Sequence, residues 1–174
     1  MDNRRTYLLV DGYNIINAWG ELKVLLEDDF EGARERLNEY MFEYAAYYGE
    51  EVYVVYDAYL TDAKTTKEEK RHHVHIIYTK ENQTADAYIE KKVRDLTSDV
   101  RIMVKVVTSD WVQQRQILGS GGIRLTPWEL KDKCVRIRRK IERKYQKSSE
   151  TTVESRLGQG SFKKLHDLLK EAKK

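Results

Sequence analysis

Hydrophobic positions follow two alternating patterns along the chain. Short apolar runs of three to six residues, a length expected of buried strands, occur at Tyr7–Val10, Val52–Tyr56, Val74–Tyr78, Ile102–Val107 and Ile123–Leu125. Between these runs, apolar residues recur every three or four positions, as on the buried face of a helix. Strands that alternate with helices predict an α/β fold built from βαβ units, with a mostly parallel sheet of about five strands.

Glycine and capping residues mark the boundaries of the predicted helices. One helix is predicted from about Phe30 to Tyr48, where Gly49 provides a stop. A second begins after Thr84, a suitable N-cap, and continues to about Leu96.

A third long helix has several agreeing start signals. Thr126 caps it, the chain's only proline takes the first helical position, and Glu129 completes a capping box, so we predict a helix to about Tyr145. Two shorter segments follow from the same reasoning: a polar loop over Thr61–His73 and a short helix over Trp111–Leu118.

The length of 174 residues suits one α/β domain with a small appendage. Residues 148–160 are rich in Ser, Thr, Glu, Gln and Gly, which indicates a linker. A short amphipathic helix is predicted after it, over Phe162–Ala172. We therefore divide the chain into a domain of residues 1–147 and an extension of residues 148–174.

The net charge of +3 conceals a strong asymmetry. Residues 1–130 contain 17 Lys or Arg and 23 Asp or Glu, a net charge of −6, whereas residues 131–174 contain 15 and 6, a net charge of +9. An acidic body with a basic C-terminal arm is suited to placing a metal site against a polyanion. A solvated amphipathic helix with a soluble tail would give the same distribution.

Composition argues against a membrane-bound or exported protein. No segment approaches the roughly 18 consecutive apolar residues of a membrane span, and the N-terminus lacks the apolar core of a signal peptide. The single cysteine, Cys134, excludes an internal disulfide and falls on an apolar helical stripe, where we interpret it as core. A reducing cytoplasmic setting is expected.

Four aspartates stand at the carboxyl ends of predicted strands, or one turn beyond. Asp11 and Asp57 end the first two strands, Asp86 follows the third just inside a helix start, and Asp110 follows the fourth. In a parallel sheet these ends meet along one edge, where ligands bind. Carboxylates gathered there repel one another unless a cation neutralises them. The sequence therefore predicts a metal site.

Each aspartate also has an ordinary structural interpretation. Asp11 belongs to an Asp-Gly turn signal, and Asp57 could simply begin a loop. Asp110 could cap a helix, a role for which Ser109 competes, and Asp86 would gain from the helix dipole in a first turn. The prediction of a metal site depends on the position of all four aspartates at one edge of the sheet more than on any one of them.

The ligand chemistry suits a hard divalent cation such as Mg²⁺ or Mn²⁺. One cysteine cannot build a zinc cluster, and the four histidines lack the H-E-x-x-H spacing, so we interpret them as structural or solvated. One or two such ions can activate a water and stabilise the leaving oxygen in phosphodiester hydrolysis. The sequence contains neither a G-x-x-x-x-G-K-[ST] loop nor a G-x-S-x-G elbow.

Five motifs, in order, resemble one known family. They are Leu8-Leu9-Val10-Asp11-Gly12-Tyr13-Asn14-Ile15-Ile16, Val54-Val55-Tyr56-Asp57-Ala58, Tyr78-Thr79-Lys80-Glu81, Thr84-Ala85-Asp86 and Val107-Thr108-Ser109-Asp110. Over residues 6–146 this order and spacing resemble the YacP-like NYN domains of the wider PIN-like nuclease group. The resemblance implies a PIN-like three-layer α/β/α sandwich with a mostly parallel sheet, and the charge pattern adds a basic C-terminal helical extension. It also implies a Mg²⁺- or Mn²⁺-dependent endoribonuclease of the bacterial cytoplasm, acting on mRNA at the translating ribosome.

The resemblance also assigns roles to residues. Asp11, Asp86 and Asp110 would be the catalytic, metal-binding acids, and Asp57 would support them within the metal site. The candidates for other supporting roles are Asn14, which would orient a ligand or water, Glu81, Thr108 and Ser109. The family often has Glu where this chain has Gln83, which weakens any role for that position.

Bound RNA would need cations near the acidic edge to hold its phosphates. The candidates are the Lys64–Lys70 loop, Arg71, Lys80, Arg115, Arg124, Arg136, Arg139, Lys140 and Arg143. Single-stranded RNA is the favoured target because its splayed bases can stack on aromatic rings. Tyr13, Trp19 and Tyr59 lie on predicted loops near the edge, with core packing as the alternative.

Two functions of other classes compete with the nuclease. A non-catalytic RNA- or ribosome-binding adaptor would keep the fold and use the basic arm. A phospho-acceptor signalling domain needs a paired acid cluster after the first strand and a lysine that ends a late strand. Asp11 stands alone at its position and Lys105 lies inside a strand, so the sequence disfavours the second.

Overall fold

A single six-stranded sheet organises the chain. The computed structural model describes residues 4–58, 64–109 and 122–146, and within them the strand order is β3-β4-β2-β1-β5-β6. Every neighbouring pair is parallel except β3 and β4. The strands are Arg5–Asp11 (β1), Glu51–Tyr56 (β2), Lys67–Arg71 (β3), Val74–Tyr78 (β4), Ile102–Val107 (β5) and Ile123–Leu125 (β6).

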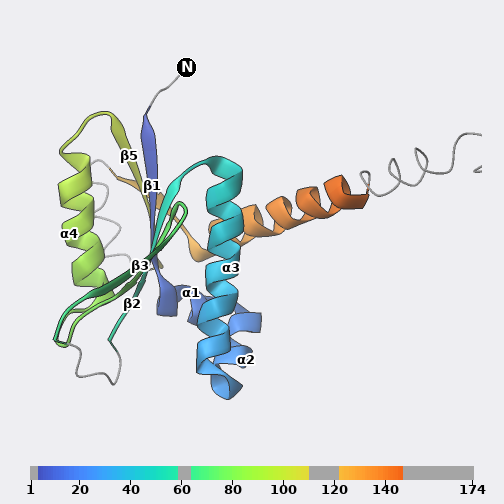
Figure 1. Ribbon diagram of the computed structural model, residues 1–174, viewed down its shortest axis with the longest axis horizontal. Helices are drawn as coiled ribbons and strands as arrows, with labels where there is room; N and C mark the ends of the chain where they lie inside the picture. Colours follow the sequence, from blue (N-terminus) through green and yellow to red (C-terminus); the bar gives the residue numbers. More distant parts are fainter. Residues whose placement is uncertain (1–3, 59–63, 110–121, 147–174) are drawn as a thin grey trace, which may run out of the picture. The chain divides into compact units, whose positions relative to one another are not determined.

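Helices cover both faces of this sheet. The covering helices are Gly12–Ala18 (α1), Gly20–Asp28 (α2), Phe30–Tyr48 (α3) and Ala85–Thr97 (α4). A separate helix is formed by residues 127–146. Figure 1 shows α4 against one face of the sheet and α3 on the opposite side, with α1 and α2. The predicted α/β sandwich with a mostly parallel sheet is thereby confirmed.

The chain divides into two compact units, residues 1–135 and residues 136–174, and the sheet belongs to the first. In the second unit, residues 136–146 are helical. The helices predicted over Trp111–Leu118 and Phe162–Ala172, and the linker predicted over residues 148–160, lie outside the described residues. Among the described helices, none has the length and hydrophobicity needed to span a membrane.

Alternating side chains of the central strands build a core on each face of the sheet. On one face, Leu9 and Val55 pack with Ile89 of α4. On the other face, the buried Tyr56 ring meets α3, where its hydroxyl donates to Asn38 Oδ1 at 2.9 Å. A one-residue slip would move each side chain to the opposite face and disrupt the contacts of both cores, so the strand register is fixed.

Capping residues mark the starts and ends of the helices at the positions that the sequence predicts. Thr84 Oγ1 accepts from the Ala87 amide at 3.1 Å at the start of α4. Thr126 and Glu129 form the reciprocal capping box, with distances of 3.1 Å and 2.6 Å. Gly49 ends α3 with a φ of +66°, a left-handed conformation that glycine adopts without strain.

One predicted loop is partly wrong. Within Thr61–His73, residues 67–71 form β3, which pairs antiparallel with β4 through a hairpin turn at His72, where φ is +54°. All five β3 residues are exposed and charged, so no apolar alternation marks the strand in the sequence. Charged residues on an edge strand protect the sheet from pairing with other chains.

The prediction that Tyr13 lies on a loop is also wrong, whereas Trp19 does lie in the connection between two helices. Tyr13 lies in α1, and Trp19 stands between α1 and α2 with only 1% of its surface exposed. The indole Nε1 of Trp19 donates to the Pro127 carbonyl at 2.9 Å. Trp19 is therefore core, and Tyr59 lies outside the described residues.

Candidate active site

The carboxyl ends of the parallel strands lie level with one another. Asp11 pairs with Val55 in the register of β1 and β2, Tyr56 pairs with Tyr78 in β2 and β4, and Val10 pairs with Val107 in β1 and β5. The residues that leave these ends, Asp11, Asp57, Thr79 and Thr108, therefore come to one edge of the sheet. This is the edge at which open α/β sheets bind ligands.

Asp11 is the last residue of β1 and the N-cap of α1. Its Oδ1 accepts a hydrogen bond from the Asn14 amide at 3.1 Å. The pKa of Asp11 is raised to about 6, chiefly by burial and also by the charges of Asp86 and Asp57, against the opposing effect of the Asn14 hydrogen bond. A carboxylate in this environment is stabilised by a nearby cation, because the cation offsets both burial and repulsion.

Asp57 connects the end of β2 to the start of α4. Its Oδ1 accepts a hydrogen bond from the amide of Ala85, the first residue of α4. Burial raises the pKa of Asp57, the Ala85 hydrogen bond lowers it, and the charge of Asp86 raises it. Asp57 therefore holds the first turn of α4, and with it Asp86, beside the strand ends.

Asp86 is the third aspartate at this edge; we call the edge formed by Asp11, Asp57 and Asp86 the acidic edge. It is exposed in the first turn of α4, and its charge acts on both Asp11 and Asp57. Three aspartates that are distant in sequence are thus electrostatically coupled, as the strand order predicts. Asp110 lies outside the described residues.

The described aspartates do not enclose an ion by themselves. Within residues 4–58, 64–109 and 122–146, no group of three or more His, Cys, Asp or Glu side chains is arranged to hold a metal. The donor chemistry nevertheless fits a hard divalent cation, because burial and the charges of two further carboxylates raise the pKa of the half-buried Asp11. The predicted set of Asp11, Asp57, Asp86 and Asp110 stays a prediction.

Asn14 joins the acidic edge to the end of β5. The Ser109 hydroxyl donates to Asn14 Oδ1 at 3.1 Å, across 95 positions of sequence. Ser109 directly precedes Asp110 in the chain, and Thr108 before it is buried with 3% exposure. The structure therefore brings two predicted supporting residues, Asn14 and Ser109, into direct contact.

Glu81 lies in the turn between β4 and α4, which follows the carboxyl end of β4, and its side chain is exposed. Its predicted supporting role stays a prediction.

Arg34 is a charged neighbour of the edge that sequence reasoning missed. Its guanidinium lies over the rings of Phe30 and Tyr78, at 5.1 Å and 5.5 Å from their centroids. Burial raises the pKa of Tyr13, Arg34 opposes that rise, and Asp57 adds to it. Tyr13 thus stands within electrostatic reach of both Arg34 and the acidic edge. The signal available in the sequence was the spacing of Phe30 and Arg34, which places both on the same face of the predicted helix.

The predicted RNA-binding cations are distributed unevenly. Lys80 is exposed just after β4, at the acidic edge, and Arg124 is exposed in β6, opposite Val106. Arg71 pairs with Val74 at the start of β4, so the antiparallel direction of β3 carries it to the opposite edge. There it forms an ion pair with Glu69 at 3.4 Å.

The remaining cations fall outside the sheet or the described residues. Arg115 lies outside the described residues. On the helix of the second unit, four predicted RNA-binding cations are exposed: Arg136, Arg139, Lys140 and Arg143. Their predicted role in RNA binding stays a prediction.

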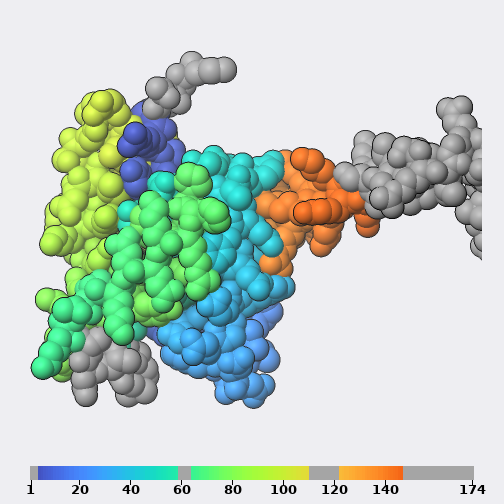
Figure 2. All heavy atoms as spheres, in the orientation of Figure 1, coloured from blue at the N-terminus to red at the C-terminus, as the bar shows by residue number. Residues whose placement is uncertain are grey.

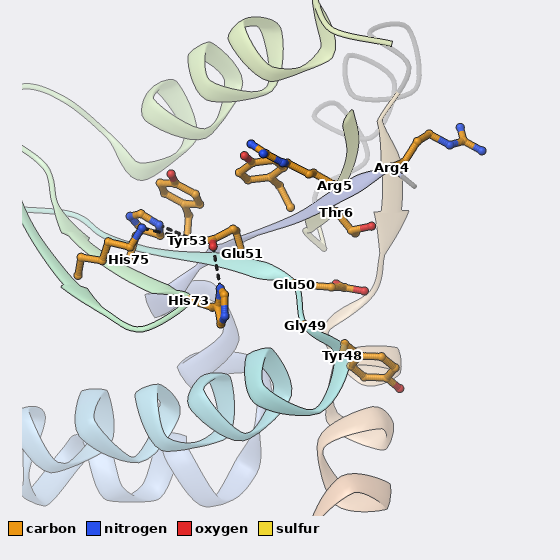
Figure 3. A pocket seen from close by; sticks show the side chains of 12 residues that line it. Arg4, Arg5, Thr6, Tyr48, Gly49, Glu50, Glu51, Tyr53, His73 and His75 are labelled. Atoms are coloured by element: carbon orange, nitrogen blue, oxygen red, sulfur yellow. Dashed lines mark hydrogen bonds and ion pairs between the residues drawn. The ribbon is translucent and has the colours of Figure 1, made fainter. Parts of the chain in front are cut away.

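A cavity of about 550 Å³ lies at the opposite edge of the sheet (Figure 3). The carboxylate of Glu51 lies there between two imidazoles, 2.7 Å from His73 Nδ1 and 2.9 Å from His75 Nε2. The His75 ring also stacks on Tyr53, with 4.1 Å between ring centroids. His73 and His75 serve as hydrogen-bond partners of Glu51, and His75 also packs on Tyr53, in keeping with their structural interpretation.

Comparison with known proteins gives matches of both sequence and structure. The profile of the YacP-like NYN domain matches residues 8–170, beyond the 6–146 that carry the motifs. The protein YacP of Bacillus subtilis (strain 168) is 44% identical over 140 residues, which are 80% of this chain and 81% of that protein.

Two crystal structures of Rae1 (YacP) from Bacillus subtilis have a similar fold. One, of a single-substitution mutant, has a TM-score of 0.72 and 41% identity, with 83% of this chain and 84% of that chain covered. The other has a TM-score of 0.71 and 38% identity, with 94% of each chain covered.

Proposed function

This chain belongs to the YacP-like NYN domain family, whose fold is of the nuclease type, and we propose that it is a metal-dependent endoribonuclease that hydrolyses RNA phosphodiester bonds. The observation that carries the proposal is the half-buried Asp11, whose pKa is raised to about 6 by burial, Asp86 and Asp57. Perturbed carboxylates at a ligand-binding edge are typical of functional sites.

Asp11, Asp86 and Asp110 are the residues that would hold Mg²⁺ or Mn²⁺. The ion, when bound, activates water and stabilises charge on the leaving oxygen. The chain's own contribution is to arrange oxygen ligands: Asp57 fixes the first turn of α4 beneath Asp86, and Asn14 is held by Ser109. This second layer of contacts keeps ligands oriented and is as much part of a metal site as the ligands.

We extend the proposal to mRNA at the translating ribosome in the cytoplasm, as the family resemblance implies. The basic character of residues 131–174, with a net charge of +9, supports a polyanionic partner such as ribosomal RNA. A non-catalytic adaptor would use the same basic arm, and cleavage distinguishes the two. An adaptor binds RNA and leaves it intact under every metal condition.

Asp86→Asn is expected to abolish RNA cleavage while the protein stays folded. Asp86 is exposed, so its replacement leaves the core untouched, but it removes one predicted ligand of the ion. Metal-ion catalysis lowers the activation free energy by several kcal/mol, so we expect the cleavage rate to fall by at least about 100-fold. Purified protein is incubated with single-stranded RNA, and separately with translating ribosomes, with and without Mn²⁺, and the cut ends are mapped.

The matched control is Asp28→Asn, which neutralises an exposed aspartate at the end of α2. Cleavage by this control should equal that of the wild type. Absence of cleavage by the wild type on both substrates, with binding intact, would favour the adaptor and overturn the proposal.

A further inference from the structure

Four lysines line a groove beside α4. The groove has a volume of about 490 Å³ and is formed by the segment before β3, the turn between β4 and α4, and one side of α4. We call it the lysine groove, after Lys64, Lys80, Lys91 and Lys92. Figure 2 shows the atoms of α4 (yellow-green) beside those of β3 and β4 (green). Asp95 is the acidic residue in its lining.

The charges of the lysine groove are not neutralised within the described residues. Lys70, Lys105 and Lys131 each form an ion pair with a glutamate, at 4.0, 2.5 and 2.5 Å. The four groove lysines form no ion pair there, and Lys92 instead lies over the Tyr53 ring at 4.6 Å. Four ammonium groups with one carboxylate attract an anion, and binding an anion relieves their repulsion.

The lysine groove adjoins the acidic edge. The Thr66 hydroxyl donates to Gln83 Oε1 at 3.1 Å, which ties the segment before β3 to the start of α4. Gln83 lines the groove and is followed in the chain by Thr84, Ala85 and Asp86. Lys80 and Gln83 therefore bring one end of the groove to the carboxyl edge of the sheet, at the start of the helix that carries Asp86.

The α4 side of the groove has the dimensions of a short stretch of nucleic acid. Tyr88, Lys91, Lys92 and Asp95 share one helix face, because their spacing is three or four residues. From Tyr88 to Asp95 a helix rises about 10 Å. Successive phosphates of one strand in a duplex are about 3.4 Å apart along the axis, so about three phosphates fit along this length. The half-buried Tyr88 adds an aromatic ring against which a base can stack.

We infer that the lysine groove binds the sugar-phosphate backbone of single-stranded RNA on one side of the scissile bond and leads it to Asp86. This inference rests on the proposed endoribonuclease function. An acidic peptide offers the same charge, but it would gain nothing from a groove that ends at the nuclease edge. Of the four lysines, Lys91 and Lys92 enter as RNA contacts here for the first time.

The test is the salt dependence of RNA binding by Lys91→Gln. Lys91 is exposed on α4 and lines the groove, so its replacement removes one charge without disturbing the core. Binding of a short fluorescein-labelled oligouridylate is followed by anisotropy in EDTA, where no cleavage occurs. Each phosphate contact on a single strand contributes about 0.7 to the slope of log K against log salt concentration. We therefore expect the slope to fall by about 0.7 and the Kd at about 0.1 M KCl to rise about 5-fold.

A double variant and a remote control make the result decisive. Lys64→Gln combined with Lys91→Gln should lower the slope by about 1.4, because the two contacts add. Lys23→Gln removes one exposed charge from α2, outside the groove, and should leave slope and Kd near wild-type values. Equal behaviour of Lys91→Gln and Lys23→Gln would overturn the inference. The inference would also be overturned if polyglutamate displaced the oligouridylate from the wild type at a lower concentration than unlabelled RNA does, but did not displace it from Lys91→Gln.

The outcomes also separate the groove from the proposed function. If wild-type protein cleaves RNA with Mn²⁺ but the Lys91→Gln slope is unchanged, the groove inference fails and the nuclease stands. If the slope falls as expected while no RNA is ever cut, the groove stands as an RNA-binding surface and the nuclease fails.

Discussion

Asp11→Asn is expected to abolish RNA cleavage and, in the absence of divalent ions, to make the fold more stable. The wild-type carboxylate has its pKa raised from 3.8 to about 6 by burial and by two neighbouring aspartates, so ionising it costs free energy in the folded state. At about 1.36 kcal/mol per pKa unit, and allowing for a weaker hydrogen bond from Asn14, the gain is on the order of 2 kcal/mol. That corresponds to a Tm increase of several degrees in EDTA at neutral pH.

The effect of Asp11→Asn on stability depends on pH in a fixed direction. Below pH 3.8 both states of the wild type hold the proton, and between pH 3.8 and about 6 the unfolded chain releases it first. Wild-type stability therefore falls through this window as the pH rises, and the advantage of the variant appears over the same range. Denaturation in EDTA across these pH values measures it.

Addition of Mg²⁺ should reverse the order of thermal stability, making the wild type more stable than Asp11→Asn. An ion that binds only the folded form raises the Tm of the wild type, and Asp11→Asn should lose most of that increase. Asp28→Asn, at an exposed position, should differ from the wild type by less than about 0.5 kcal/mol. A lower stability of Asp11→Asn than of the wild type in EDTA at neutral pH would contradict this account of Asp11.

Gly12→Ala is expected to destabilise the fold strongly. A Cβ on Gly12 would overlap the Tyr56 ring, three of whose carbons would lie within 2.9 Å. That ring cannot move aside at low cost, because it is fully buried and its hydroxyl donates to Asn38 Oδ1 at 2.9 Å. Overpacking of this kind costs about 1–3 kcal/mol, and we expect the upper part of that range, with a Tm decrease of roughly 5–10 °C.

Cleavage should fall in Gly12→Ala as well, since Gly12 directly follows Asp11 and begins α1. The control is Gly20→Ala at the start of α2, where an added Cβ meets nothing within 4 Å. Alanine is a better helix former than glycine, so this variant should be neutral or up to about 1 kcal/mol more stable. Equal stability of the two variants would show that the contact with Tyr56 is unimportant.

The parallel sheet could be predicted from the sequence because its strands are buried on both faces. Runs such as Tyr7–Val10 and Val52–Tyr56 are apolar or aromatic throughout, which is typical of central strands. Chain segments that follow them, Asp57 among them, must then meet at one edge. The capping signals at Thr84 and Thr126 placed two helix starts correctly, because a cap acts locally.

The elements that the sequence did not reveal lack such signals. Strand β3 consists of charged, exposed residues, and its pairing with β4 depends on the hairpin turn at His72 rather than on burial. The Asp-Gly pair at Asp11 indicates a turn, yet it begins α1, with the Asp11 side chain as N-cap. Trp19 is core because α1 and α2 bring it against Pro127, a contact across 108 positions.

Within the site, long-range contacts were the part that could not be predicted. The shared edge of Asp11, Asp57 and Asp86 follows from strand order, but the hydrogen bond of Asp57 to Ala85 depends on how α4 docks. Arg71 was expected near the acids and lies at the other edge, because the direction of β3 was unknown. The lysines of α4 became relevant only when a groove placed them beside Lys80.

The central claim is that the aspartates at the carboxyl edge of the sheet hold a divalent ion. The most direct measurement is an anomalous difference map from crystals of the protein grown with MnCl₂. We predict a Mn²⁺ peak about 2.1 Å from carboxylate oxygens of Asp11 and Asp86, with Asp110 as a further ligand. A map in which Mn²⁺ binds only elsewhere, or in which the carboxylates of Asp11 and Asp86 are too far apart to share one ion, would contradict the account.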